Sequence, residues 1–208
     1  GARVMLVDQD RDSLEIAKTN FKDNDRIMVC EADVSDNTQT KDYITKTITK
    51  WDKIDILFAN AGFSGTSAPI TSYPDDIFDK VMAVNVRGSF LACKYALPEM
   101  NNKGSIIITS SIMGVTARPG SIAYITSKHA LIGLMRGVAK EAAPRNIRVN
   151  VLAPGPVDNA FQLEIEERAS KASGTNVTEM LNNWISLGRH ASRQEIANTA
   201  YFLASNKS

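Results

Sequence analysis

The sequence predicts an α/β fold in which helices cover both faces of a doubly wound parallel sheet, giving three layers. Five short apolar runs alternate with longer stretches of helical periodicity along the 208 residues. The runs are continuous rather than alternating in polarity, which is typical of strands buried on both faces. The composition, 43% hydrophobic and 23% charged, is that of an ordinary globular chain. We therefore expect one domain over residues 1–208.

The predicted strands are rich in β-branched residues and are bounded by polar ones. They lie at residues 4–7, 27–30, 54–58, 106–108 and 147–152. Between them, apolar residues recur every three or four positions, as in Leu14, Ala17 and Phe21, which predicts helices packed on the sheet. The helical stretches lie near residues 14–21, 44–51, 74–100, 121–142, 158–187 and 192–204.

Charge and cysteine usage exclude several classes of function. The 24 Lys and Arg residues nearly balance the 23 Asp and Glu residues, so the chain has no general attraction for nucleic acid or anionic membranes. No apolar run approaches the roughly 18 residues of a membrane span. Cys30 and Cys93, like His129 and His190, stand at no spacing typical of metal or redox sites. We expect a reduced, cytoplasmic protein without metal, membrane or nucleic-acid partners.

Polar residues and tight turns follow each predicted strand. Ligands of open parallel sheets bind beyond the carboxyl ends of the strands, so these residues predict a binding cleft along one rim of the sheet. In chain order they are Asp8, Asp33-Val34, Asn60-Ala61-Gly62, Ser110-Ser111 and Pro154-Gly155-Pro156.

Asp8 has two interpretations. A carboxylate at such a strand end can accept hydrogen bonds from the adenosine ribose of a dinucleotide, and it would repel a 2′-phosphate, which favours NAD over NADP. Alternatively, Asp8 caps a helix that starts near Asp10. The sequence leaves both open.

Tyr124 and Lys128 stand four residues apart in a helical stretch, so their side chains share one face. A phenol has a free pKa of ~10, and lowering it to about 7 requires about 4 kcal/mol. An ammonium about 4 Å away supplies about that much at an effective dielectric constant near 20. Ser111, just past a strand end, could donate to a carbonyl oxygen that gains negative charge. The three residues therefore predict carbonyl–alcohol chemistry.

Several motifs along nearly the whole chain resemble those of the short-chain dehydrogenase/reductase family. They are Asp8, Asp33-Val34, Asn60-Ala61-Gly62, Val84-Asn85-Val86-Arg87-Gly88, Ser111, Tyr124-Ile125-Thr126-Ser127-Lys128, Ile147-Arg148-Val149-Asn150 and Pro154-Gly155-Pro156-Val157. Each motif is weak alone, but their order and spacing together are specific. The resemblance implies a Rossmann fold and an NAD(P)-dependent oxidoreductase.

The resemblance also implies catalytic roles. Tyr124 would be the general acid and base, Lys128 would lower its pKa and hold the nicotinamide ribose, and Ser111 would orient and polarise the substrate carbonyl. Asn85 would hold a water through its main chain and so link Lys128 to solvent.

The cofactor implied is NAD, with NADP disfavoured by Asp8. The residues assigned to adenine are Asp33 and Val34, those on the adenosine side are Asn60, Ala61 and Gly62, and those packed against the nicotinamide are Pro154, Gly155 and Val157. Tyr124 and Lys128 would also touch the cofactor. The family's first strand and glycine-rich phosphate loop are expected before Gly1, and its last strand after Ser208, so we expect a chain truncated at both ends.

Residues 158–188 are expected to form an amphipathic lid over the substrate, because they follow the nicotinamide turn. Simple packing onto the sheet is the alternative. Met113, Phe161 and Trp184 are the candidate substrate contacts. The acidic run Glu164, Glu166 and Glu167 is expected to be a solvated helix face, and His190 to be structural or exposed.

The leading hypothesis is an NAD-dependent enzyme that transfers a hydride between the nicotinamide and a secondary alcohol or ketone. A 3-oxoacyl-thioester reductase acting on an acyl carrier protein is the first alternative, and an inactive truncated module that only oligomerises is the second. The stretches 74–100 and 121–142 are more apolar than one sheet face requires, so we expect a homodimer or homotetramer.

Overall fold

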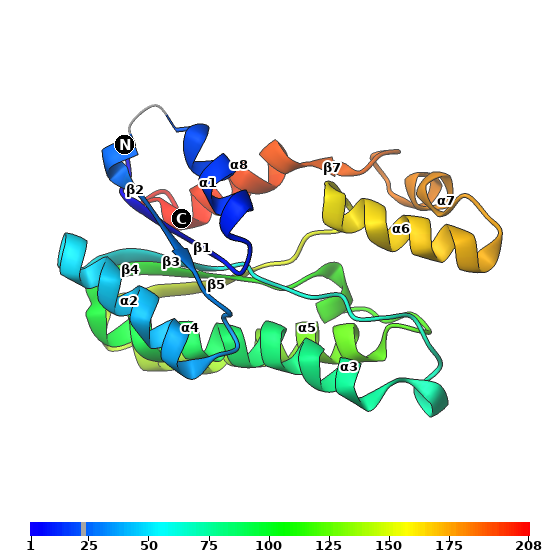
Figure 1. The fold of residues 1–208 in the computed structure, drawn as a ribbon, viewed down its shortest axis with the longest axis horizontal. Helices are drawn as coiled ribbons and strands as arrows, with labels where there is room; N and C mark the ends of the chain where they lie inside the picture. Colours follow the sequence, from blue (N-terminus) through cyan, green and yellow to red (C-terminus); the bar gives the residue numbers. More distant parts are fainter. Residues whose placement is uncertain (22–23) are drawn as a thin grey trace.

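The computed structural model describes residues 1–21 and 24–208. Its middle layer holds five strands: β1 (Val4–Asp8), β2 (Ile27–Glu31), β3 (Ile54–Ala59), β4 (Met100–Thr109) and β5 (Arg148–Leu152). Helices α2 (Asn37–Trp51), α4 (Gly88–Ala96) and α5 (Ile122–Ala142) lie on one side, and α1 (Arg11–Thr19) and α8 (Arg193–Ala204) on the other (Figure 1). The predicted three-layer α/β fold is confirmed.

All the pairings between these strands are parallel, as predicted, but the sheet consists of two separately hydrogen-bonded parts. β1 pairs with β2, and β3, β4 and β5 pair in that order. Only part of the sheet is buried on both faces. Helices α2 and α4 contact β3, whereas Ile56 and Phe58 of that strand stay 45% and 44% exposed. The expectation of burial on both faces is therefore wrong for β3.

The stretch 74–100 is one helical path with a wider turn inside it. It comprises α3 (Asp75–Val81), a π-helical segment (Met82–Arg87) and α4, and it ends in a 3-10 turn (Leu97–Glu99) that contains Pro98. π-helical turns are rare and occur often at functional sites, because the extra residue per turn redirects a side chain. Asn85 lies in this segment and is completely buried.

Side-chain caps explain where most of the other helices begin. The oxygens that accept from a backbone N–H of the first turn belong to Asp10, Asp36, Asn159, Asn176 and Ser192. Asp10 therefore caps α1, and the alternative of Asp8 as that cap is wrong. The Asp8 Oδ1 atom instead accepts from the backbone N–H of Asp10, 3.0 Å away.

Beyond β5, the chain leaves the sheet and returns. β6 (Val157–Asp158) pairs in parallel with β7 (Ala191–Ser192), and α6 (Ala160–Ser173) and α7 (Val177–Trp184) lie between them in sequence. Gly174, with φ of +69°, ends α6 in a left-handed conformation that a residue with a side chain rarely adopts. The segment expected to be the lid thus forms a lobe at one end of the molecule (Figure 1).

Candidate active site

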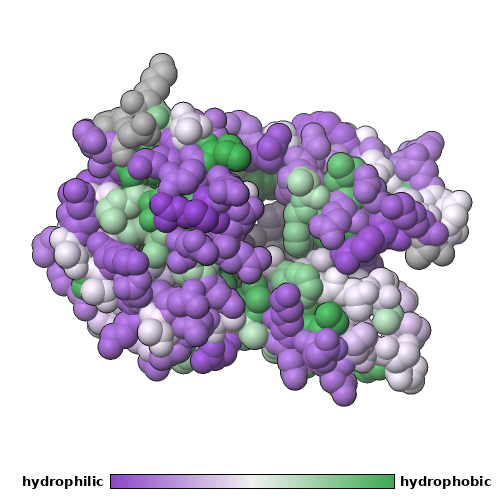
Figure 2. All heavy atoms as spheres, viewed as in Figure 1, coloured by the Kyte–Doolittle hydropathy of each residue, from purple (hydrophilic) through white to green (hydrophobic). Residues whose placement is uncertain are grey.

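The predicted rim residues lie together at the carboxyl ends of the parallel strands. Asp8 ends β1, Ser111 follows β4 and Pro154 follows β5. The lobe of α6 and α7 stands at the same end (Figure 1), and the space-filling view shows a hollow between this lobe and the part of the molecule that carries α1 (Figure 2). The structure therefore brings together residues that are distant in the sequence beside an opening in the surface.

Ser111, Tyr124 and Lys128 occupy one small region. Ser111 is 8% exposed, its hydroxyl accepts from the Met113 backbone N–H at 3.1 Å, and it lies close enough to the Tyr124 phenol to lower the pKa of that group. The Lys128 Nζ atom lies 5.4 Å from the centre of the Tyr124 ring, one helical turn along α5. The predicted juxtaposition of phenol, ammonium and strand-end hydroxyl is present.

Burial, rather than the ammonium, dominates the acidity of the phenol in the protein without cofactor. Burial raises the pKa of Tyr124, and hydrogen bonding to Ser111 and the charge of Arg118 offset this only in part. Burial also lowers the pKa of Lys128 to about 8. The expectation that Lys128 alone makes the phenol ionisable near neutral pH is therefore wrong for this state, because both groups are taken out of water together.

Lys128 is held by the end of β4. Its ammonium, on a side chain only 3% exposed, donates to the Thr109 carbonyl oxygen at 2.9 Å. A Cβ atom on Gly62 would lie 3.6 Å from the same Nζ atom, so the loop after β3 runs beside it. The Thr109 hydroxyl donates to the Asn60 Oδ1 atom at 2.9 Å, which ties this loop to the end of β4.

Ser110 and Gly114 hold the strand end against α5. The Ser110 hydroxyl donates to the Lys128 carbonyl oxygen at 2.8 Å. A Cβ atom on Gly114 would lie 2.4 Å from the Ser110 Oγ atom and 2.8 Å from that carbonyl oxygen, so a side chain does not fit there. This close approach places Ser111, rather than Ser110, at the phenol.

Asn85 joins three segments through its side chain. Its Oδ1 atom accepts from the Phe63 backbone N–H at 2.7 Å, and its Nδ2 atom donates to the Phe63 carbonyl at 3.0 Å and to the Ser127 hydroxyl at 2.9 Å. The Asn85 carbonyl oxygen accepts from the Ser89 hydroxyl at 2.8 Å. Sequence reasoning found this residue but not its side-chain role, which fixes the loop after β3 beside α5.

The residues expected to hold the dinucleotide form a polar, open rim. Asp8, Asp33, Asn60, Ala61 and Gly62 are exposed. Asp33 accepts from the Ser35 backbone N–H and hydroxyl through one oxygen. Val34 packs against Gly88, where a Cβ atom would lie 2.8 Å from the valine Cγ2 atom. Carboxylates for ribose hydroxyls and an ammonium with donors to spare fit a nicotinamide dinucleotide.

Of the candidate substrate contacts, Met113 lies beside a catalytic group, since its backbone N–H donates to Ser111. Phe161, at the start of α6, is 40% exposed, and Trp184, the last residue of α7, is 74% exposed. In residues 1–21 and 24–208, no cluster of three or more His, Cys, Asp or Glu side chains could hold a metal ion. Over the same residues, no helix is both long and apolar enough to cross a bilayer.

The expectation that Glu166 lies on a solvated helix face is wrong. Glu166 is 3% exposed rather than solvated, and its carboxylate accepts from His190 Nε2 at 2.6 Å, Gln162 Nε2 at 2.7 Å and the Thr178 hydroxyl. The other ring nitrogen of His190 lies 2.7 Å from the Asn182 Oδ1 atom. This network, centred on the carboxylate, ties α6, α7 and the residue before β7 into one body. The acidic run carries no local signal for it, because the partners lie up to 24 residues away.

We predict that Glu166→Gln loosens this lobe. Burial raises the pKa of Glu166, but hydrogen bonds from Thr178, Gln162 and His190 outweigh burial and hold it below 4.5. A carboxamide cannot accept all three bonds, so the free energy of unfolding should fall by about 2 kcal/mol. The wild-type contribution should be lost as the pH falls below 4.5, because the folded-state pKa is the lower one.

Urea unfolding and amide hydrogen exchange over residues 160–190 measure this effect. The exposed neighbour Glu167→Gln, on the same helix, is the matched control. Equal stability and equal exchange in the two variants would contradict the assignment.

The chain is similar to known proteins over its whole length. Residues 1–208 match the family model described as "Enoyl-(Acyl carrier protein) reductase". The chain is 35% identical over 217 residues to the uncharacterized oxidoreductase YxbG of Bacillus subtilis, covering 100% of this chain and 77% of that protein. It is 34% identical over 177 residues to the 3-oxoacyl-[acyl-carrier-protein] reductase FabG of Thermotoga maritima, covering 84% and 68%.

A solved structure is similar in fold. The crystal structure of an NAD+-bound xylitol dehydrogenase superposes with a TM-score of 0.91 at 31% sequence identity, and the match covers 98% of this chain and 83% of that one. The similarity includes the strand ends and helices that carry the candidate site, since it extends over almost the whole of this chain.

Proposed function

The chain belongs to the short-chain dehydrogenase/reductase family, and within that family we propose an NAD-dependent enzyme that interconverts a secondary alcohol and a ketone. The observation that carries the proposal is the buried set of Ser111, Tyr124 and Lys128 beside the open rim that ends in Asp8. A bound nicotinamide supplies the hydride, and its oxidised ring adds a positive charge.

The protein's own residues would manage the proton. In the reduction of a ketone, the Tyr124 hydroxyl donates its proton to the carbonyl oxygen, and the Ser111 hydroxyl donates a hydrogen bond to the same oxygen as its negative charge develops. The Lys128 ammonium stabilises the phenolate that remains. Asn85 keeps the loop after β3 in place beside Lys128. In alcohol oxidation, the same groups act in reverse.

Binding and closure would use the rim and the lobe. Lys128 and Tyr124 would hold the nicotinamide ribose, with Pro154, Gly155 and Val157 behind the ring, and Asp33, Val34, Asn60, Ala61 and Gly62 would line the adenosine half. The lobe of α6 and α7 would exclude water above the substrate, with Met113, Phe161 and Trp184 as substrate contacts. A kcat that does not respond to solvent viscosity would argue against closure of the lobe as a slow step.

Asp8 would select NAD. We predict that Asp8→Ala weakens NADH binding by about 10- to 100-fold, because the ribose hydroxyls lose a charged acceptor. NADPH binding should tighten at the same time, because a charge that repels the 2′-phosphate is gone. Fluorescence titration with both cofactors measures the two constants, and Asp12→Ala, an exposed carboxylate on α1, is the control. Unchanged NADH affinity in Asp8→Ala would contradict the proposal that Asp8 selects NAD.

A 3-oxoacyl-thioester reductase is the second candidate. The similarity to FabG of Thermotoga maritima favours it. The description of the matching family model names the same acyl carrier protein, although with an enoyl rather than a 3-oxoacyl group. Turnover of a 3-oxoacyl thioester with NADPH at a rate above that of simple ketones with NADH would select this function. If neither NADH nor NADPH bound, the inactive oligomerising module would be the favoured hypothesis.

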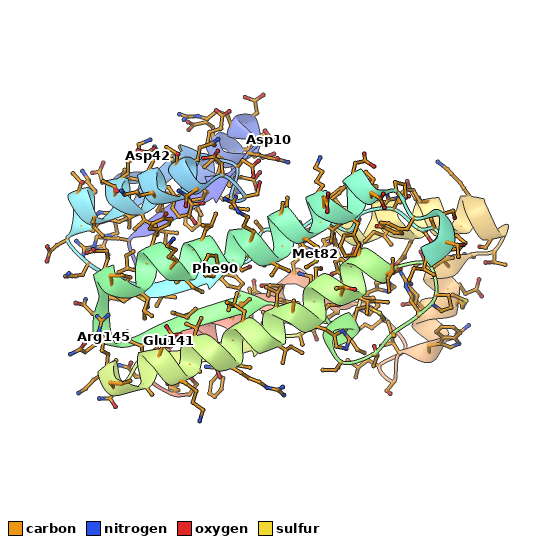
Figure 3. All side chains as sticks on the ribbon, turned by 90° about the horizontal axis from the view of Figure 1, so that it is seen from below. Asp10, Asp42, Met82, Phe90, Glu141 and Arg145 are labelled. Carbon is orange, nitrogen blue, oxygen red and sulfur yellow. The ribbon has the colours of Figure 1, made fainter. Side chains whose placement is uncertain are left out.

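We also propose that the protein is a homodimer or homotetramer. Helices α4 and α5 lie side by side on the face opposite α1, and Phe90, 47% exposed, is on this face (Figure 3). A second copy packed on α4 and α5 would bury Phe90 in a symmetric assembly. A sedimentation mass of one chain would contradict it.

A reduced, cytoplasmic location fits the two cysteines. Cys30 and Cys93 are both free and buried. Proteins of oxidising compartments more often pair their cysteines. Recovery of the protein from a secreted fraction would contradict this location.

A further inference from the structure

Two arginines stand beside the site without a part in the proposed hydride transfer. Arg118 lies in the loop between Ser111 and α5, and Arg168 lies in α6. Both side chains are exposed. Their positions relative to the reacting groups suggest what kind of substrate the site takes.

Arg118 is close to Tyr124. Its Nε atom hydrogen-bonds to the Ser121 hydroxyl at 3.3 Å, and Ser121 directly precedes α5, three residues before Tyr124. The charge of Arg118 also lowers the pKa of Tyr124, against the larger effect of burial. The guanidinium therefore acts electrostatically on the Tyr124 phenol, the group that would contact the carbonyl oxygen of a substrate.

Arg168 connects the lobe to the loop after β3. Its guanidinium lies 3.2 Å from the Ser64 hydroxyl and 3.3 Å from the Gly65 carbonyl oxygen. The same loop reaches the turn that carries Arg118, since the Ala68 backbone N–H donates to the Gly120 carbonyl at 3.1 Å. This one loop therefore contacts both Arg168 in the lobe and the turn that follows Arg118.

Neither guanidinium has an acidic partner in the described residues. Within residues 1–21 and 24–208, no carboxylate forms a salt bridge with Arg118 or Arg168, although α6 also carries Glu164, Glu166 and Glu167. Glu166 is committed to His190 inside the lobe. An arginine presents five donors in a planar fork that matches a carboxylate, and most of those of Arg118 have no partner here.

We propose that Arg118, assisted by Arg168, makes the enzyme selective for alcohols and ketones that carry a carboxylate beyond the reacting carbon. This inference rests on the proposed dehydrogenase function. The carboxylate binds to the free edge of the Arg118 guanidinium, which orients the carbonyl toward Ser111 and Tyr124. Arg168 adds positive potential from the lobe.

The test compares linear oxo acids, which differ in the distance between keto group and carboxylate, with the methyl ester of each acid. The measured quantity is the ratio of kcat/KM for acid to kcat/KM for ester, with NADH and the full-length protein. For the best acid, the wild-type ratio should exceed about 10, and Arg118→Met should lower it by about 10- to 100-fold. The ratio of Arg118→Lys should lie between those of the wild type and Arg118→Met. Arg168→Met should lower the ratio less than Arg118→Met does.

The acid-to-ester ratio separates recognition of the substrate carboxylate from any change in the pKa of Tyr124. Loss of Arg118 changes the pKa of Tyr124 for acid and ester alike, so this effect cancels. Arg136→Met removes an exposed charge farther along α5 and should leave the ratio unchanged. The wild-type ratio should also fall with added salt, because both guanidiniums are exposed.

Two failures are distinguishable. If the wild type reduced each methyl ester as efficiently as the corresponding acid, selection by Arg118 would be overturned. The dehydrogenase function would remain intact. Absence of turnover on acids, esters and neutral ketones alike, with NADH bound, would overturn the function itself.

Discussion

Replacing Tyr124 by Phe is expected to lower kcat by about 100- to 10,000-fold, the range that a positioned general acid or base contributes. The variant loses the hydroxyl that donates the proton and keeps the ring that packs in α5. NADH affinity should change much less than kcat, because the variant loses only the ribose contact of Tyr124, whereas Asp8, Lys128 and the loop after β3 are untouched. Steady-state kinetics on a ketone and fluorescence titration of NADH measure the two effects.

A matched control is available on α4. The Tyr95 hydroxyl donates to the Asn37 Oδ1 atom at 2.6 Å and lies outside the candidate site, so Tyr95→Phe should keep full activity. Turnover retained in Tyr124→Phe would show that another group transfers the proton. Loss of NADH binding together with activity would instead show that the variant has damaged the cofactor site.

The strand ends were predictable because the chemistry of the rim is local in sequence. Buried β-branched runs located the five strands, and the residue that follows each strand must lie at one edge when the strands are parallel. The four-residue spacing of Tyr124 and Lys128 likewise fixed their common face on α5. These features follow from periodicity alone.

What the sequence could not supply depends on tertiary contacts. The π-helical turn that buries Asn85 follows from packing between the loop after β3 and α5, and no residue pattern predicts it. The burial of Glu166 depends on partners in α7 and before β7. The raised pKa of Tyr124 reflects how much protein surrounds the phenol, which spacing does not reveal.

The second large effect is expected on replacing Lys128. Its buried charge lowers the stability of the folded protein, but the proposed activity requires it. Its pKa is lowered by burial from 10.5 to about 8 in the folded protein. Between these values the unfolded chain binds the proton and the folded protein does not, so stability without cofactor should rise as the pH increases from about 8 to 10.5. Below about pH 8 the folded protein carries the full cost of burying the ammonium, about 3 kcal/mol.

Lys128→Met should therefore lower turnover by about 100- to 10,000-fold without a matching loss of stability. The variant removes the cost of the buried charge, but the Thr109 carbonyl loses its donor, which costs about 1–3 kcal/mol and leaves stability at pH 7 nearly unchanged. The rise in stability between pH 8 and 10.5 should disappear. Urea unfolding at several pH values measures this, with the exposed Lys140→Met of the same helix as control. If Lys128→Met instead lost several kcal/mol at pH 7 and kept the pH dependence, Lys128 would be a structural residue, and the assignment of the proton chemistry to Tyr124 would lose its main support.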